Sequence, residues 1–402
     1  MAGHVKTKSK KEPKPVLMDY LRELICAQME NRVPSNIPEG ITLKEIEDIA
    51  HRGQMDYCLL GALLKLDLPQ ADIEGIRPFL VRSTMKTLAQ VCAVREIQER
   101  LEEAGVKSQV LKGSVMKFIY PTPELREMSD VDIIVYDQSL THAESVLNEL
   151  GYEKQQAVKH HTIFTKGPFL LLEVHWCLFD ENVDQSQFSY YYDNFRSTLV
   201  EGTRYTYEFS KEDFYVYLIS HMAKHFYETG CGIRNLLDVY IYRTVYKDIL
   251  DEEHIRNELE KCGTIDFEKH IRTLAFIWME GKSSNSFYND MFEYMLDCGI
   301  YGKGENGVWG KLAKEKSLSG KQKSLKNLYY FPSLKYMQEY YTWLEKCPIL
   351  LPIAWGMRAL TGALSPEGMN RRKLVAFEDK KRIETIRNIY DKVHLDFNSK
   401  KK

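Results

Sequence analysis

The chain has 402 residues, 44% of them apolar and 28% charged, which is the composition of an ordinary globular protein. Lysine plus arginine (55) nearly balance aspartate plus glutamate (57), which excludes a global field that would attract nucleic acid or an anionic membrane. The length exceeds what one compact core usually organises, so two or three domains are expected.

The cysteine pattern and the apolar segments indicate a cytoplasmic protein. Eight cysteines are scattered without a C-x-x-C pair, which argues against zinc ribbons and thioredoxin-like motifs. A Lys-rich start with Pro13 and Pro15 replaces an apolar signal peptide, so free thiols in the cytosol are expected. The most apolar stretch, residues 348–357, is shorter than the ~20 residues that span a bilayer. We expect no stable membrane insertion and favour a buried C-terminal helix over a membrane-surface helix.

Helical periodicity alternates with one strand-rich segment along the chain. Thr42 and Glu45 fit a capping box that opens an early helix, and a long amphipathic helix over about 76–104 ends at Gly105. The predicted organisation is a disordered basic tail (1–15), a helical region (16–104), an α/β domain (105–210), a C-terminal helical domain (211–395) and a second disordered tail (396–402).

The α/β segment predicts an α+β fold with a small mixed sheet between helical regions. A hairpin is expected at Gly167-Pro168. If the turn has two residues, Lys166 pairs with Phe169 and His160 lies opposite His175; a slip of one residue puts His161 there instead. The expected elements are strands over 106–111, 131–136, 160–165 and 169–176, with helices over 115–119 and 139–150.

Beyond about residue 210 the pattern is helical again. Helices are expected over 211–228 and 233–246, with several more to about residue 393. A Gly- and Lys-rich interruption over 299–326 predicts a mobile loop. Its lysines could meet a polyanion such as tRNA, although a solvated loop is favoured.

The residues that carry chemistry begin with an Asp-x-Asp pair. On a strand, Asp130 and Asp132 project to the same face, while Val131, Ile133 and Val135 line the other. Two carboxylates so close repel each other unless a cation lies between them. Hard oxygen ligands suit Mg²⁺, which keeps water and triphosphate oxygens as its other ligands. The pair therefore predicts a magnesium–nucleotide site.

Two further features support that site. Gly113 and Ser114 stand at a strand-to-helix junction, where backbone N–H groups can hold phosphate. Glu173 lies in an apolar strand, on the face that also carries Leu171 and His175. A carboxylate in such a strand needs a partner, and a metal shared with the aspartates would supply one.

Several histidines and one lysine are secondary candidates. His221 and His225 share a helix face, but no further metal ligand is evident beside them. Lys224, between them, is a candidate phosphate or base contact, and the alternative is a set of structural hydrogen bonds to Asp238. His160 and His161 are interpreted as a surface pair.

With these residues in place, the chain resembles the nucleotidyltransferase family proteins of bacteria, a branch of the DNA polymerase β-like nucleotidyltransferase superfamily. The resemblance runs from about Leu111 through the C-terminal helices. The motifs that carry it are Leu111-Lys-Gly113, Tyr120-Pro-x-Pro-x-Leu-Arg126, Asp130-Val-Asp-Ile-Ile-Val135, Glu173-Val-His-Trp176, and His221-Met-Ala-Lys-His225 followed by Arg234-Asn-Leu-Leu-Asp238.

The resemblance implies a magnesium-dependent transfer of a nucleoside monophosphate from ATP or another NTP to an acceptor hydroxyl, with release of pyrophosphate. Asp130 and Asp132 would ligate two Mg²⁺ ions, and Glu173 would ligate the catalytic one. The nucleotide would be bound by Lys112, Gly113, Ser114, Arg126 and Lys224. Fifteen residues separate Ser114 from Asp130, more than is usual in the superfamily, so the segment between them must loop out.

The acceptor stays open between a small molecule, a glycan, a peptide and RNA. A rival interpretation is a catalytically silent nucleotide-binding module that keeps the fold, against which the intact Asp130, Asp132 and Glu173 argue. A second rival is a toxin-like enzyme that modifies RNA or protein with the same chemistry.

Overall fold

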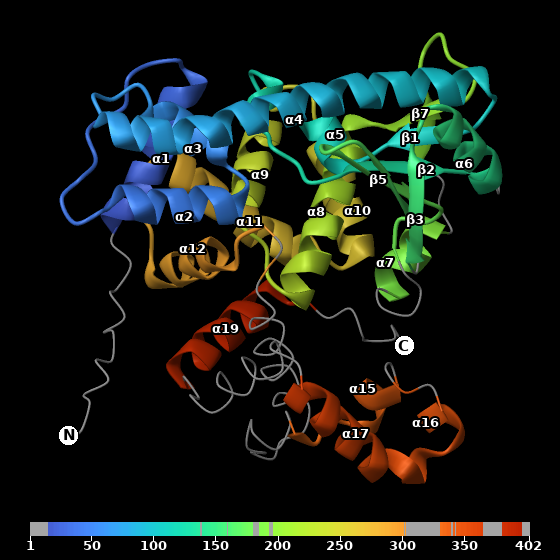
Figure 1. Cartoon of the computed structure of the whole chain (residues 1–402). Coiled ribbons are helices and arrows are strands. Elements are labelled where there is room, and N and C mark those ends of the chain that lie inside the picture. Colours follow the sequence, from blue (N-terminus) through green and yellow to red (C-terminus); the bar gives the residue numbers. More distant parts are fainter. Residues whose placement is uncertain are drawn as a thin grey trace.

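The computed structural model describes residues 15–136, 139–158, 160–179, 185–192, 196–300, 302, 330–338, 341, 343–364 and 380–395. In it, a group of N-terminal helices and a seven-stranded sheet lie at the two ends of one long helix, with the C-terminal helices below them (Figure 1). This arrangement confirms the predicted α+β fold with a mixed sheet between helical regions. Most of the Gly- and Lys-rich interruption and most of both tails lie outside the described residues.

The N-terminal helices pack together and are joined to the sheet by the long helix α4. The hydroxyl of Thr42 accepts a hydrogen bond from the backbone N–H of Glu45, which confirms half of the predicted capping box. Residues buried along α4 recur every three or four positions, from Ile76 in the helical core to Leu101 in the core beneath the sheet. The helices are α1 (Pro15–Met29), α2 (Leu43–Gly53), α3 (Asp56–Leu63) and α4 (Gln70–Glu103).

The sheet has the order β3-β4-β5-β2-β1-β7-β6. The pairs β2–β5 and β1–β7 are parallel, and the other neighbours are antiparallel. The strands are β1 (Ser108–Val110), β2 (Val131–Val135), β3 (Glu153–Val158), β4 (His161–Lys166), β5 (Leu170–His175), β6 (Ser197–Leu199) and β7 (Thr206–Phe209). The short helices of this region are α5 (Lys112–Met116), the 3-10 helix η1 (Pro123–Leu125), α6 (Leu140–Glu149) and α7 (Gln185–Tyr192).

Three strands were not predicted, and they include both edges of the sheet. β3 and β6 are edge strands, and residues 153–157 of β3 are exposed and, apart from Ala157, polar. They lack the apolar alternation that identifies a half-buried strand, because neither face of an edge strand needs to be fully covered.

The register of the β4–β5 hairpin differs from the favoured prediction. Lys166 pairs with Leu170, so the turn contains Gly167, Pro168 and Phe169, and His161 lies opposite His175. Gly167 has φ +59°, a conformation that favours glycine in longer hairpin turns. A three-residue turn moves the register by one position, which is the alternative that the sequence left open.

The C-terminal helices form most of the larger hydrophobic core. α8 has the predicted bounds, and α9 is one residue shorter than predicted at each end. These helices are α8 (Lys211–Glu228), α9 (Arg234–Val245), α10 (Glu252–Cys262), α11 (Ile265–Met279), α12 (Ser286–Cys298), α15 (Leu334–Gln338), α16 (Trp343–Lys346), the 3-10 helix η2 (Pro348–Leu350), α17 (Leu351–Leu364) and α19 (Lys380–Val393).

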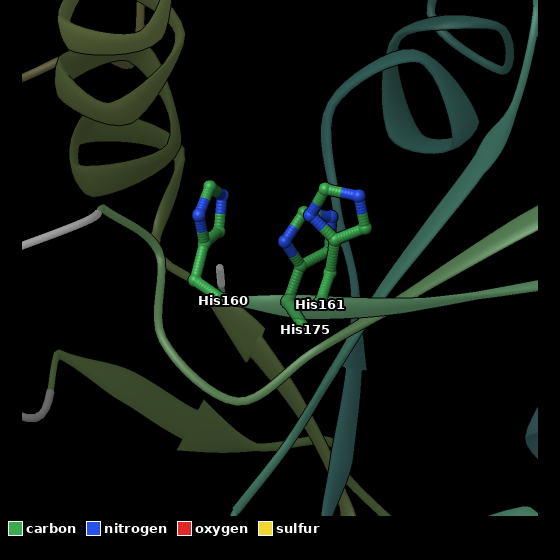
Figure 2. Close-up of side chains that lie close together, drawn as sticks. All are labelled: His160, His161 and His175. Carbon is green, nitrogen blue, oxygen red and sulfur yellow. The ribbon is translucent and has the colours of Figure 1, made fainter. Parts of the chain in front are cut away.

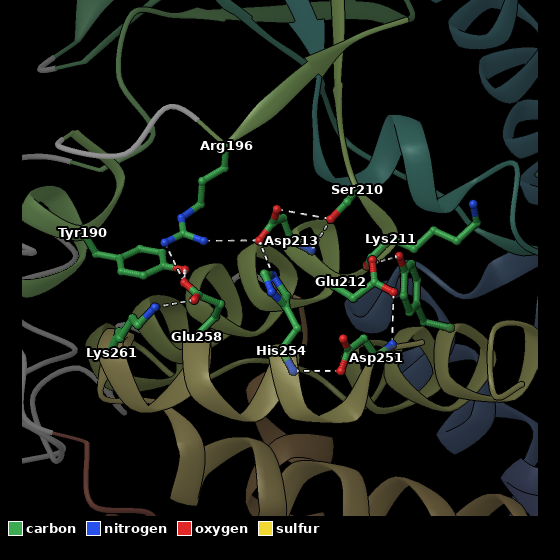
Figure 3. Close-up of polar contacts among 11 residues, drawn as sticks. Tyr190, Arg196, Ser210, Lys211, Glu212, Asp213, Asp251, His254, Glu258 and Lys261 are labelled. Atoms are coloured by element: carbon green, nitrogen blue, oxygen red, sulfur yellow. Dashed lines mark hydrogen bonds and ion pairs between the residues drawn. The ribbon is translucent and has the colours of Figure 1, made fainter. Parts of the chain in front are cut away.

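A polar network fastens the strand β6 to α8 and α10 (Figure 3). The guanidinium of Arg196 pairs with Glu258 at 2.5 Å and with Asp213 at 3.4 Å. Glu258 also accepts a hydrogen bond from the hydroxyl of Tyr190 at 2.7 Å, and His254 lies 3.1 Å from Asp213. Because these groups come from four elements or their ends, the network holds the far end of the sheet region against the C-terminal helices.

The apolar segment 348–357 is not the buried helix that was favoured. Ile349 is 87% exposed, Ile353 56% and Leu360 69%, whereas Ala354 is buried against Met337 and Leu344. Only one side of α17 is therefore covered by described residues. No helix in the described part of the chain is both long and apolar enough to cross a bilayer.

The segment just before β2 is held from several sides by helices. The guanidinium of Arg126 makes a bidentate ion pair with Asp238 of α9, with N···O distances of 2.9 Å, and the hydroxyl of Tyr120 donates to the same carboxylate at 2.7 Å. Arg126 and Asp238 are 6% and 0% exposed. Burial would lower the pKa of Arg126, but Asp238 outweighs it and the net pKa is raised. A bidentate guanidinium–carboxylate pair of this kind fixes orientation as well as distance.

This ion pair makes a prediction about folding stability. Asp238→Asn leaves the buried Arg126 charge uncompensated, so the free energy of unfolding should fall by about 3–5 kcal/mol. Urea denaturation followed by circular dichroism measures this change. Replacing both partners, Arg126→Met with Asp238→Leu, should recover most of the loss. Asp248→Asn, at an exposed position after α9, should change stability by less than about 0.5 kcal/mol. A loss from Asp238→Asn no larger than the Asp248→Asn effect would contradict the role given to the pair.

Candidate active site

Two of the three carboxylates predicted from the sequence, Asp132 and Glu173, meet where β2 and β5 run side by side. The two strands are parallel, and Asp132 pairs directly with Glu173. Adjacent strands place such partners about 4.8 Å apart on the same face. A carboxylate oxygen of each residue and a ring nitrogen of His175 lie within 4.8 Å of one another. Asp130 immediately precedes β2, two residues before Asp132.

Asp132 is the most strongly held carboxylate of the group. Its Oδ1 accepts hydrogen bonds from Lys112 Nζ at 2.8 Å and from His175 Nε2 at 2.9 Å. Burial by itself raises the pKa of Asp132, but the charge of Lys112 and the hydrogen bond from His175 outweigh it, so the net pKa is lowered. Lys112 reaches this position from a left-handed backbone conformation, with φ +47°. Asp132 is therefore ionised and fixed in place.

The pKa of Asp130 is shifted in the opposite direction from that of Asp132. Burial and the negative charge of Asp132 raise its pKa from 3.8 to about 6. Burial likewise raises the pKa of Glu173, but a hydrogen bond from His175 outweighs it, and the net pKa is lowered. Asp132 and Glu173 are thus stabilised as anions. The ionised form of Asp130 is destabilised by burial and by the charge of Asp132. Such an arrangement is typical of functional sites.

Three histidines lie together beside these carboxylates, and two of them, His161 and His175, contact Glu173 or Asp132. The rings of His160, His161 and His175 lie with centroids 5.0–5.5 Å apart, and Figure 2 shows them pointing to the same side of the β4–β5 hairpin. His161 and His175 side chains are 13% and 3% exposed. Burial and the positive charge of Lys224 lower the pKa of His160 to about 3. His160 and His161 are half-buried rather than a plain surface pair, and the register of the hairpin places His161 opposite the buried His175.

One face of α8 also points toward the site. The ring nitrogens Nε2 of His221 and His225 lie 3.1 Å apart, as their spacing predicts. Burial, and after it the charge of Lys112, lowers the pKa of His221 well below its ordinary value. The ammonium of Lys224 lies 5.9 Å from the ring centroid of Phe179, and its charge also lowers the pKa of His160 and His221. Lys224 therefore lies on the side of α8 that faces the histidines.

The Gly113-Ser114 turn is tightly packed in this structure. A Cβ on Gly113 would lie 3.2 Å from Arg126 Nη1 and 3.3 Å from Met128, so any larger residue would have to displace one of these side chains by a few tenths of an ångström. Ser114 is 2% exposed, and its backbone N–H donates to the carbonyl of Leu111. The structure thus gives these two residues packing roles. Their contact with phosphate stays a prediction.

Arg126 makes its hydrogen bonds away from the three carboxylates, although the negative charge of Asp130 contributes to its raised pKa. Its guanidinium is committed to Asp238 and to the carbonyl of Glu127. The segment between Ser114 and Asp130, which was predicted to loop out, contains the short helix η1, and the buried pair of Arg126 with Asp238 follows directly after it. Asp238 is accordingly bonded to Arg126 and Tyr120, and a contact of Arg126 with nucleotide stays a prediction.

The donor set fits a hard divalent cation. Asp132 and Glu173 supply carboxylate oxygens, the ligands that Mg²⁺ prefers, whereas Asp130 belongs to neither group of described donors that one ion could reach. The raised pKa of Asp130 also shows that its charge lacks compensation, which a cation would supply. The histidines offer nitrogen donors beside them, and the groups within reach of one ion among the described residues are Asp132–Glu173–His175 and His160–His161–His175.

Comparison with known proteins identifies the family. The sequence model of the family described as "Uncharacterised nucleotidyltransferase" matches residues 42–280, more than half of the chain. The chain belongs to this nucleotidyltransferase family. No curated protein and no solved structure gives a significant match. The family match begins well before the sequence resemblance at Leu111, so it includes the helices α2, α3 and α4.

Sequence reasoning missed two parts of this site. It did not give His175 a role, although the residue shares a strand face with Glu173 and a two-residue spacing could have indicated it. It also missed Tyr217 of α8, which is 1% exposed and whose hydroxyl has no hydrogen-bond partner among the described residues. The charges of Lys112 and Asp132 both affect the pKa of Tyr217, whose net value burial raises. No local signal distinguishes this tyrosine from its apolar neighbours.

Opposite effects on stability are expected for Asp130→Asn and Asp132→Asn in metal-free protein. The folded pKa of Asp130 is about 6 and its ordinary value is 3.8. Asp130 in the folded state therefore binds more protons between these values, and its contribution to wild-type stability falls as pH rises from about 4 to 6. Asp130→Asn lacks this loss and should be about 1–3 kcal/mol more stable than wild type at pH 7. Asp132→Asn should be less stable by about 1–3 kcal/mol, because Lys112 and His175 lose their acceptor.

Chemical denaturation in EDTA at pH 4 to 8 measures both effects. Adding Mg²⁺ should stabilise wild type more than Asp130→Asn, which reverses part of the difference. Two variants that change stability in the same direction and by similar amounts would refute this account of the charges.

Proposed function

We propose that this protein is a magnesium-dependent nucleotidyltransferase that moves a nucleoside monophosphate from ATP or another NTP to an acceptor hydroxyl and releases pyrophosphate. The observation that carries the proposal is the direct pairing of Asp132 with Glu173 across parallel strands, with Asp130 two residues away. Membership of the nucleotidyltransferase family supports it. The catalytic unit would be residues 105–210, between helical regions at 16–104 and 211–395.

In this proposal Asp130, Asp132 and Glu173 hold Mg²⁺, as two ions. The metal supplies a positive charge for the triphosphate and an activated acceptor oxygen. Lys112 and His175 keep Asp132 ionised and oriented, so that its second oxygen is presented in one direction. Lys224, from α8, places a fixed cation beside the site, where negative charge develops on the leaving pyrophosphate. Gly113, Ser114 and Arg126 complete the proposed nucleotide-binding set.

The compartment is proposed from the cysteines, and the acceptor is proposed by its chemical class. The eight cysteines form no disulfide, which fits a reducing compartment such as the cytosol. The acceptor is a hydroxyl of a small molecule, a glycan, a peptide or RNA. Incubation of the protein and a cell extract with each labelled NTP, followed by mass identification of the labelled product, would name both the base and the acceptor.

A silent nucleotide-binding module is the second candidate, and the closed Gly113-Ser114 turn favours it. The buried Ser114 and the committed Arg126 leave this turn engaged with the protein itself. Pyrophosphate release in single-turnover assays separates the two. Label transfer with stoichiometric pyrophosphate supports the transferase, whereas binding of Mg·NTP without any product supports the module.

Loss of both aspartate charges is expected to abolish Mg·NTP binding. Asp130→Asn combined with Asp132→Asn removes the anionic anchor of the metal–triphosphate complex. Isothermal titration calorimetry should show at least a hundredfold weaker Mg·NTP binding, with circular dichroism confirming the fold. Glu208→Gln, on the strand β7 away from the carboxylates, is the matched control. Unchanged affinity in the double variant would remove the aspartates from the nucleotide site.

Lys224→Ala should weaken triphosphate binding by about 1–3 kcal/mol, the scale of a lost charge-assisted hydrogen bond. Monophosphate binding should change much less, because the contact involves the departing phosphates. Lys211→Ala is a matched control, since Lys211 starts the same helix but lies over the ring of Tyr246. Equal losses for monophosphate and triphosphate would exclude Lys224 from the transfer.

A further inference from the structure

The three histidines at the end of the β4–β5 hairpin form a compact group of nitrogen donors. Their ring centroids are separated by 5.1, 5.5 and 5.0 Å, and one nitrogen of each ring lies within 4.8 Å of the other two. Figure 2 shows His160 at the start of β4 and the other two rings beside each other on the paired strands. A magnesium site does not explain this group, because Mg²⁺ prefers oxygen ligands.

Two of these nitrogens are buried without a partner. Nδ1 of His160 and Nδ1 of His161 are inaccessible to solvent and make no hydrogen bond to any residue that the structure describes. An unsatisfied buried polar atom costs about 1–3 kcal/mol. Two of them within one cluster indicate that a bound group completes the site.

Carboxylates occupy the other side of two of the rings. Nε2 of His175 donates to Asp132 Oδ1 at 2.9 Å, and Nε2 of His161 lies 3.7 Å from Glu173 Oε1. Metal-binding histidines generally donate their second nitrogen to a carboxylate or carbonyl, which fixes the ring and its tautomer. In His161 this arrangement leaves Nδ1, the unpartnered atom, as the ligand; in His175 it leaves the Nδ1 side of the ring.

We propose that His160, His161 and His175 bind one transition-metal dication of the zinc class through imidazole nitrogens. Imidazole suits Zn²⁺, Co²⁺, Ni²⁺ and Fe²⁺ far better than it suits Mg²⁺. Bonds of about 2.0–2.1 Å in a tetrahedral site require nitrogens about 3.3 Å apart. The three nitrogens lie within 4.8 Å of one another, so binding requires them to approach by about 1.5 Å or less. Three protein ligands leave a fourth position open for water or substrate.

This site goes beyond the proposed function, since it requires neither NTP nor transfer. The hydrogen bond between His175 and Asp132 joins this histidine site to the carboxylate site, because each site contributes one of the two residues. The pair His221–His225 on α8 is the competing location for the same ion, with its Nε2 atoms 3.1 Å apart but with only two ligands. The experiment separates these locations.

The test uses the full chain, stripped with EDTA and free of nucleotide and Mg²⁺. Calorimetric titration with Zn²⁺ should give one site per chain, and titration with Co²⁺ should give the intense visible absorption of a four-coordinate centre. His160→Asn and His161→Asn should each weaken Zn²⁺ binding at least tenfold and weaken the Co²⁺ band. His142→Asn, at an exposed position of α6, should leave both unchanged. Far-UV circular dichroism of each variant confirms that the hairpin variants fold.

Three results would overturn the proposal. They are unchanged Zn²⁺ affinity in both His160→Asn and His161→Asn, loss of Zn²⁺ binding in Asp130→Asn with the histidine variants unaffected, and loss only in the double variant His221→Asn, His225→Asn. The proposed function fails separately, through unchanged Mg·NTP binding in the Asp130, Asp132 double variant. The two failures are therefore distinguishable.

Discussion

The buried ion pair between Arg126 and Asp238 is the contact on which the position of the carboxylates depends. It fixes the segment that leads directly into Asp130 and β2 against α9. Other helices hold the same segment: Gln90 of α4 donates to the carbonyl of Met128, and the backbone N–H of Tyr57 in α3 donates to Glu127. A strand end held from three helices cannot shift without breaking buried polar contacts, each costly to leave unmade. The helices that make these contacts all lie within residues 42–280, the range that the family match covers.

Of the two aspartates in the site, only Asp132 is bonded to a positively charged side chain among the residues that the structure describes. Lys112 and His175 both bond Asp132, whereas Asp130 meets the repulsion of Asp132 with little compensation. Ionised Asp130 lowers the stability of the folded protein, and a bound cation would restore that stability. Such destabilising charges are common at binding sites. Lys224 adds positive charge from a separate element, α8, which suits an anionic ligand lying between the sheet and this helix. This charge distribution is the one that the proposed binding of a cation together with a polyanion requires.

The hairpin turn decides which side chains join this site. With the three-residue turn at Gly167, His161 lies opposite His175 and its ring reaches Glu173. Imidazole and carboxylate donors then lie side by side on one sheet face, joined by the bond between Asp132 and His175. Occupation of either donor set would change the electrostatic field at the other, because charges a few ångström apart in a buried site interact strongly.

The sequence by itself determined the elements with strong periodicity and the residues that share a strand face. It predicted β2, β5 and α8 with bounds close to those observed, and it placed Asp132 and Glu173 in one site from strand parity, because side chains alternate strictly along a strand. It could not find the edge strand β3, whose polar residues have no apolar alternation, nor the role of Arg126, whose partner Asp238 is 112 residues away. Only the tertiary structure decided the hairpin register, the burial of the histidines and the exposure of α17. Each of these depends on which surfaces meet in space, and local sequence carries no record of that.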